Sequence, residues 1–138
     1  MSGLTDQLNT EDVHRVVQHF YLQARQHPVI GHHFAGIDDF RSHEEKITAF
    51  WWLALGGTVA ELANGAPAID MINKHIALGI NAKDLELWLG LFEQTLDEEI
   101  QSTLASAWKV KLREIAAHLK KLAIDKEAGG IQIKEAEK

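Results

Sequence analysis

Apolar residues recur at steps of three and four positions along nearly the whole chain, and this spacing limits the fold more than any other feature. In the first such segment the repeat comprises Val13, Val16, Val17, Phe20, Tyr21 and Ala24. Side chains three and four residues apart share one face of an α-helix, so each segment can bury a single stripe. We find no alternation of apolar and polar residues that would favour strands. The sequence therefore predicts an all-α fold.

Proline, glycine and acidic residues indicate where these helices begin and end. The first helix should end at His27, because Pro28 disfavours a helical residue before it. A second helix is expected to start near Asp38 or Asp39 and to end at the glycine pair 56–57. Further helical segments are expected over residues 58–63, in a short stretch that ends near His75, over 81–100 and over about 104–122.

Length and composition indicate one globular domain. The chain has 138 residues and a net charge of -6, with no basic stripe that would suit nucleic acid. It contains no cysteine, which excludes disulfides and thiolate metal sites. Residues 1–6 lack a signal-peptide pattern, and the longest uncharged run, 47–60, is shorter than the roughly 20 residues that a membrane helix needs. We expect a cytoplasmic protein with a domain over residues 1–126, a loose charged tail over 127–138, and no membrane partner.

Two of the eight histidines, His43 and His75, stand in line with large apolar neighbours on expected helices. The simplest interpretation is that both are partly buried and hydrogen-bonded to backbone, although a neutral imidazole can also bind iron. Tyr21, His43 and Trp88 are polar-tipped residues at core positions on three different helices. Because a buried hydroxyl or N–H needs a partner, one shared ligand would satisfy all three.

The order of these residues resembles that of the truncated haemoglobins, most closely their group III, over about residues 13–121. Phe20–Tyr21 is similar to the aromatic–tyrosine pair whose tyrosine reaches the bound gas, and His43 is similar to the distal histidine. Trp88 is similar to the tryptophan on the distal side of the pocket. This combination of tyrosine, histidine and tryptophan is typical of group III.

The resemblance also implies a haem b and its surroundings. His75 is similar to the proximal histidine, which would bind the iron, and Lys46 stands where the family often has a basic residue for a haem propionate. A haem buries a large apolar ring and needs apolar walls. The candidate wall residues are Phe34, Ile47, Phe50, Trp51, Leu78 and Phe92.

Two features depart from the group III pattern. The stretch from Gly56 to Ile72 looks longer than expected, and the charged tail after Ile124 has no counterpart. The glycine pair that groups I and II carry before their first long helix is not found, which is consistent with group III.

A five-coordinate haem with a polar distal side implies a protein that binds O₂, CO or NO. The resemblance favours oxygen binding or transport, sensing or detoxification, with an unidentified reductase as partner, over an enzyme. Haem-dependent peroxide or nitric oxide chemistry is the alternative. A carboxylate-bridged di-iron bundle needs two Glu-x-x-His motifs, and the chain offers only Glu11 to His14. A helical interaction module without a cofactor is the remaining class.

Overall fold

The fold consists of five α-helices joined by short helical turns, in a computed structural model that describes residues 4–67 and 71–125. The helices are α1 (Thr10–Arg25), α2 (Phe40–Ala54), α3 (Met71–Leu78), α4 (Ala82–Glu99) and α5 (Ser102–Leu119). The shorter elements are the 3₁₀ turns η1 (Leu4–Asp6), η2 (Gly31–Phe34) and η3 (Val59–Glu61), and the π-helical segment η4 (Lys120–Asp125). No strand occurs in these ranges, so the all-α prediction is confirmed. The expected tail, 127–138, lies outside the described residues.

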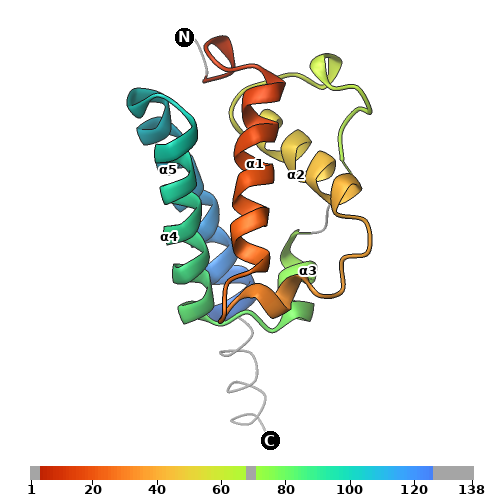
Figure 1. Cartoon of the computed structure of the whole chain (residues 1–138), viewed down its shortest axis with the longest axis vertical. Helices are drawn as coiled ribbons and strands as arrows, with labels where there is room; N and C mark the ends of the chain where they lie inside the picture. Colours follow the sequence, from red (N-terminus) through yellow and green to blue (C-terminus); the bar gives the residue numbers. More distant parts are fainter. Residues whose placement is uncertain (1–3, 68–70, 126–138) are drawn as a thin grey trace, which may run out of the picture.

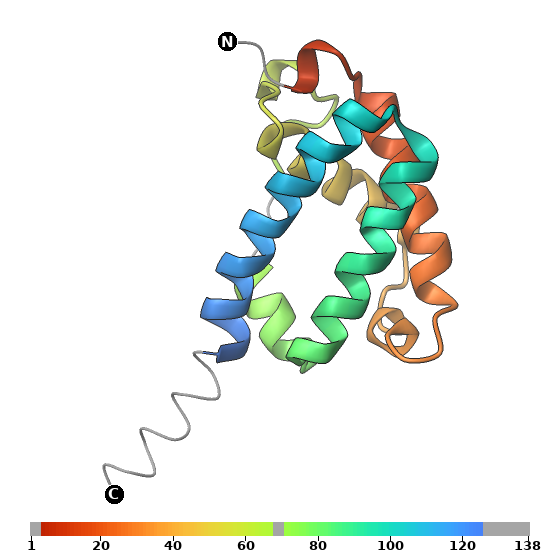
Figure 2. The same ribbon diagram turned by 90° about the vertical axis from the view of Figure 1, so that its left-hand side faces the viewer.

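The long helices form two layers of two. Helices α1 and α2 pack against each other, α4 and α5 form the second pair, and α1 contacts α4 (Figure 1). After a turn of 90°, α4 and α5 are seen to diverge from the end where they are joined, and α3 lies near their other ends (Figure 2). Helix α3 also contacts η4, which continues α5. The short helix with His75 is therefore held close to the open end of the second pair.

The core uses the apolar stripes that the sequence predicts. The largest fully buried side chains are Trp108, Ile30, Leu96, Val13, Val16, Val17 and Thr95. Full burial of a large apolar side chain contributes about 1.5–3 kcal/mol, so these stripes are a main source of the stability of the fold. Among the described residues, none of the helices combines the length and the apolar character needed to span a membrane.

Asn9 and Asp12 cap the start of α1 reciprocally, and the His27 side chain stabilises the turn that follows the helix. Asn9 accepts a hydrogen bond from the Asp12 N–H at 2.8 Å, while the Asp12 carboxylate accepts one from the Asn9 N–H at 3.0 Å. The helix ends at Arg25, slightly before the predicted His27. The His27 ring instead accepts a hydrogen bond from the Val29 N–H at 3.1 Å and shapes the turn around the proline.

Helix α2 begins and ends as the sequence predicts. Asp39 caps it by accepting a hydrogen bond from the Ser42 N–H at 3.2 Å. Beyond its end, Gly56 has a φ of 110°, in the region that favours glycine. A Cβ on Gly57 would overlap the indole of Trp52, so this glycine lets the chain pass close to that ring.

The segment after α2 differs from expectation at two points. The helical piece expected over 58–63 is the single turn η3, in which the Thr58 N–H donates to Glu61 at 2.8 Å. The short helix predicted to end near His75 continues to Leu78. Gly79, with a φ of 68°, terminates it, so the backbone of this glycine determines the end of α3.

Candidate functional site

Two side chains from neighbouring helices, Tyr21 of α1 and His43 of α2, form the polar centre of the candidate site. The Tyr21 hydroxyl and His43 Nε2 lie 2.9 Å apart and share a hydrogen bond. Burial, and then the charge of Glu44, raises the pKa of Tyr21. Burial, and then the charges of Lys46 and Lys74, lowers the pKa of His43. The pair is therefore uncharged at neutral pH, and the tautomer of His43 decides which partner donates.

A row of aromatic rings connects this pair with His75. Phe34 of η2 meets Tyr21 edge-on with ring centroids 5.5 Å apart, and meets Trp88 of α4 in the same way at 5.4 Å. The Trp88 ring lies 5.4 Å from that of His75 on α3. Tyr21 and Phe34 are buried, whereas the other three are half-buried. Five elements thus bring these residues into one continuous row, which we call the aromatic row.

Two of the expected wall residues belong to the core behind this row. Trp51 and Phe92 are buried with ring centroids 5.5 Å apart, and both contact Trp108. Phe92 also contacts Phe20, at 4.9 Å between centroids, so the core supports α1 next to the site. Leu78, by contrast, is 41% exposed at the end of α3.

Two half-buried apolar residues follow His43 along α2, and the charges of two lysines act on it. Ile47 and Phe50 follow it one and two turns later along α2 and pack only partly against the core. Lys46 is exposed, and its charge acts on His43 together with that of Lys74 on α3. Lys74 was not among the site residues predicted from the sequence, although it is a basic residue directly before His75, the candidate iron ligand. The two lysines thus place positive charge near His43.

A second polar pair was also missed. His33 lies in η2, and its imidazole N–H donates to Asp84 over 3.0 Å. The two side chains are only 4% and 11% exposed. Asp84 belongs to the first turn of α4, where its N–H donates to the Asn81 side chain at 2.7 Å. No local pattern signals the pair, because 51 residues separate its members.

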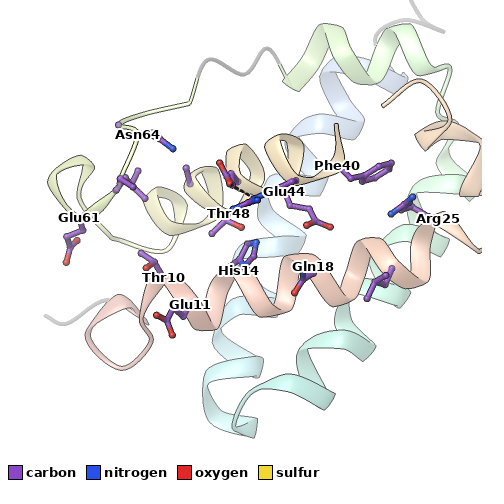
Figure 3. Close-up of a pocket in the computed structure, with 17 residues that line it drawn as sticks. Thr10, Glu11, His14, Gln18, Arg25, Phe40, Glu44, Thr48, Glu61 and Asn64 are labelled. Atoms are coloured by element: carbon purple, nitrogen blue, oxygen red, sulfur yellow. Dashed lines mark ion pairs between the residues drawn. The ribbon is translucent and has the colours of Figure 1, made fainter. Parts of the chain in front are cut away.

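A groove of about 750 Å³ lies between α1 and α2, and residues 61–65 also line it (Figure 3). His14, Gln18, Glu44 and Thr48 are among its lining residues. Glu44 is only 8% exposed, and burial raises its pKa despite the opposing charges of His14 and Arg25. None of the residues of the aromatic row lines this groove, so the two are separate features of the molecule.

The side chains of the aromatic row suit a haem better than a bare metal ion. Within the described ranges, no group of three or more His, Asp or Glu side chains is arranged to hold a metal ion. A haem iron needs only one protein ligand, and His75 offers a half-buried imidazole. Aromatic rings suit the macrocycle, the uncharged Tyr21–His43 pair suits a polar ligand, and lysines suit the carboxylates of the haem.

Comparison with known proteins identifies this architecture. The model of the bacterial-like globin family matches residues 6–121. The group III truncated hemoglobin from Campylobacter jejuni has a TM-score of 0.71 and 24% identity, covering 84% of this chain and 91% of that chain. The group II truncated hemoglobin from Bacillus anthracis has a TM-score of 0.71 and 21% identity, with 86% and 91% covered.

A third solved structure, the hemoglobin from the thermophilic phototrophic bacterium Chloroflexus aurantiacus, has a TM-score of 0.71 and 17% identity, with 86% and 98% covered. Comparison with curated protein sequences gives no match. At these identities the solved structures show the fold alone. The resemblance to truncated haemoglobins and the expected truncated-globin fold are confirmed.

Proposed function

The chain belongs to the bacterial-like globin family, which makes it a haem-binding globin, and we propose that His75 is the ligand of the haem iron. Small gaseous ligands would then bind beside Tyr21, His43 and Trp88. The observation that carries this proposal is the aromatic row. In it, Phe34 joins the hydrogen-bonded Tyr21 and His43 to the neighbouring rings of Trp88 and His75. Ordinary core packing does not require three polar-tipped side chains from three helices at one place.

Each of these residues has a role that its chemistry supports. The haem supplies reversible binding of a diatomic gas, and the protein determines how firmly the gas is held. The Tyr21 hydroxyl and the Trp88 indole N–H are the proposed donors to the gas, and neutral His43 is a third. Lys46 and Lys74 would pair with the carboxylates of haem b. The proposed walls are Phe34, Ile47, Phe50, Trp51, Leu78 and Phe92.

The leading role that we propose is O₂ binding, for transport, sensing or detoxification in the cytoplasm, with a reductase that keeps the iron ferrous. CO and NO would bind at the same place. Peroxide or nitric oxide chemistry is a second candidate, and the Tyr21–His43 pair favours it. Because its pKa is lowered, His43 is neutral and can accept a proton beside the ligand.

A visible spectrum of the purified protein tests the cofactor, and one substitution tests its ligand. The protein should show a Soret band, after supplementation with haem if necessary. His75→Leu should lose stable haem retention or change the ferrous spectrum, because the leucine has no lone pair for iron. His118→Leu, at an exposed position on α5, is the matched control and should leave the spectrum unchanged. An unaltered ferrous spectrum for His75→Leu would show that another residue binds the iron.

A further inference from the structure

The buried pair of His33 and Asp84 joins two elements that both contribute to the aromatic row. Its hydrogen bond of 3.0 Å runs from η2 to α4. The four-residue 3₁₀ turn η2 lies in the connection between α1 and α2, and a turn of this length has little rigidity of its own. A bond to the first turn of a long helix therefore fixes where η2 lies.

Each member of the pair stands beside one ring of the aromatic row. Phe34 directly follows His33, and Trp88 lies one turn after Asp84 on the same side of α4. The Phe34 and Trp88 rings meet at 5.4 Å with 87° between their planes. The pair and the ring contact are thus two adjacent links between the same elements. A shift of η2 relative to α4 would have to change both.

Phe34 passes this constraint on to Tyr21. The two rings meet edge-on at 5.5 Å and 87°, and Tyr21 holds the hydrogen bond to His43. Phe34 therefore lies between two of the proposed donors to the gas, with Trp88 on one side and Tyr21 on the other. The position of η2 therefore affects one ring contact of each donor.

We propose that His33 and Asp84 are positioning residues, whose bond holds Phe34 against Trp88 and so sets how firmly the protein retains O₂. This inference rests on the proposed function, in which Trp88 and Tyr21 donate to the gas. The pair does not touch the gas, and its effect is transmitted through Phe34 and Trp88. If the pair served stability alone, breaking it would lower the free energy of unfolding without altering gas retention in the folded protein.

Asp84→Asn is the primary test, on the full chain loaded with haem. Asparagine keeps the shape of the side chain but removes the charge that accepts from His33, which weakens the bond. The O₂ dissociation rate should rise roughly threefold to tenfold, as expected for a change in coupling between contacting residues. The CO dissociation rate should change far less, because CO depends less on hydrogen-bond donors.

Two variants of His33 and one control sharpen this test. His33→Leu should act like Asp84→Asn, whereas His33→Gln keeps an N–H donor and should partly restore the wild-type O₂ rate. Glu93→Gln is the matched control, because it removes a carboxylate of α4 that pairs with Arg113 of α5 at 2.7 Å on the surface. It should leave both dissociation rates unchanged. If His33→Leu does not fold, Asp84→Asn and His33→Gln still decide the question.

A double variant separates positioning from stability. In a Trp88→Phe background, Asp84→Asn should have little further effect on O₂ dissociation, since the ring through which it acts has changed. An unchanged ratio of O₂ to CO dissociation rates in Asp84→Asn would overturn the inference while the wild type still binds O₂. A wild-type protein that binds no haem would overturn the proposed function as well, so the two failures are distinguishable.

Discussion

The hydrogen bond between Tyr21 and His43 makes the two residues a single unit. At 2.9 Å, each satisfies the polar atom of the other in a mainly apolar environment. If Tyr21 donates, a gas has to compete with His43 for the hydroxyl proton. If Nε2 of His43 carries the proton, Tyr21 accepts from His43 and can donate to the gas at the same time. We expect this second tautomer when a ligand is held.

Tyr21→Phe should raise the O₂ dissociation rate by roughly tenfold or more and change CO dissociation far less. A hydrogen bond to a partly charged acceptor contributes about 1.5–3 kcal/mol, and about 1.4 kcal/mol corresponds to a factor of ten. Phenylalanine keeps the ring that contacts Phe34 at 5.5 Å, so packing is preserved. Stopped-flow displacement measures both rates. Equal small changes for O₂ and CO would make Tyr21 a wall residue only.

His43→Ala should accelerate CO association with little effect on haem affinity, because removal of the half-buried ring opens a path for the gas. Flash photolysis measures the association rate. Glu45→Ala, an exposed position on the same helix, is the control and should leave it unchanged. An unchanged rate in His43→Ala would indicate that the histidine is not a gate. On O₂ dissociation, His43→Ala and Tyr21→Phe should be non-additive, since the two residues share one hydrogen bond.

At the scale of elements, the sequence predicts the long helices well because each presents one apolar stripe. The sequence also predicts that Tyr21, His43 and Trp88 place polar groups within those stripes, and the three residues lie on α1, α2 and α4. The connecting segments were predicted less well. η2 has no stripe, and its place depends on the bond from His33 to Asp84, which a local pattern cannot reveal.

Replacing glycine by alanine should have opposite effects on stability at Gly79, which follows α3, and at Gly90, which lies inside α4. Gly79 has a φ of 68°, and an added Cβ would meet nothing within 4 Å, so the cost of Gly79→Ala arises from the backbone alone. Gly79→Ala should therefore lower the free energy of unfolding by about 1–2 kcal/mol. Gly90 lies inside α4 with equally open space, and Gly90→Ala should stabilise the protein by about 0.5–1 kcal/mol. Denaturant unfolding compares the two, and the same sign for both would contradict this account.

At the scale of the whole molecule, the candidate site is assembled from five elements spread along the chain. The order of the site residues along the chain can be read from the sequence without a structure, and it was enough to indicate the family. Their adjacency could not be derived from spacing, since Phe34 joins Tyr21 to Trp88 only through the packing of η2 between α1 and α4. The effect of Lys74 on His43 likewise depends on how α3 faces α2.

The layer of α1 and α2 contains a buried carboxyl group, that of Glu44, whose ionisation should make the stability of the whole molecule depend on pH. Glu44 is 8% exposed, and burial raises its pKa above the ordinary value of 4.5, against the lowering effects of His14 and Arg25. The folded state therefore keeps the proton to a higher pH than the unfolded state does. The free energy of unfolding should fall as the pH rises through the raised pKa, because the folded protein must then bury a charge.

Glu44→Gln should accordingly stabilise the protein at pH 7, because the amide carries no charge to bury. The gain should shrink as the pH is lowered towards 4.5, the ordinary pKa of this carboxyl, where the wild-type side chain is itself increasingly neutral. Urea unfolding of wild type and variant across this range measures the difference. Glu45→Gln is the control, since Glu45 is half exposed and lies 3.6 Å from Arg41 on the surface, where such pairs contribute little. If Glu44→Gln were destabilising at pH 7, attraction to His14 and Arg25 would outweigh the cost of burying the carboxylate, and Glu44 would stabilise the contact of α1 with α2.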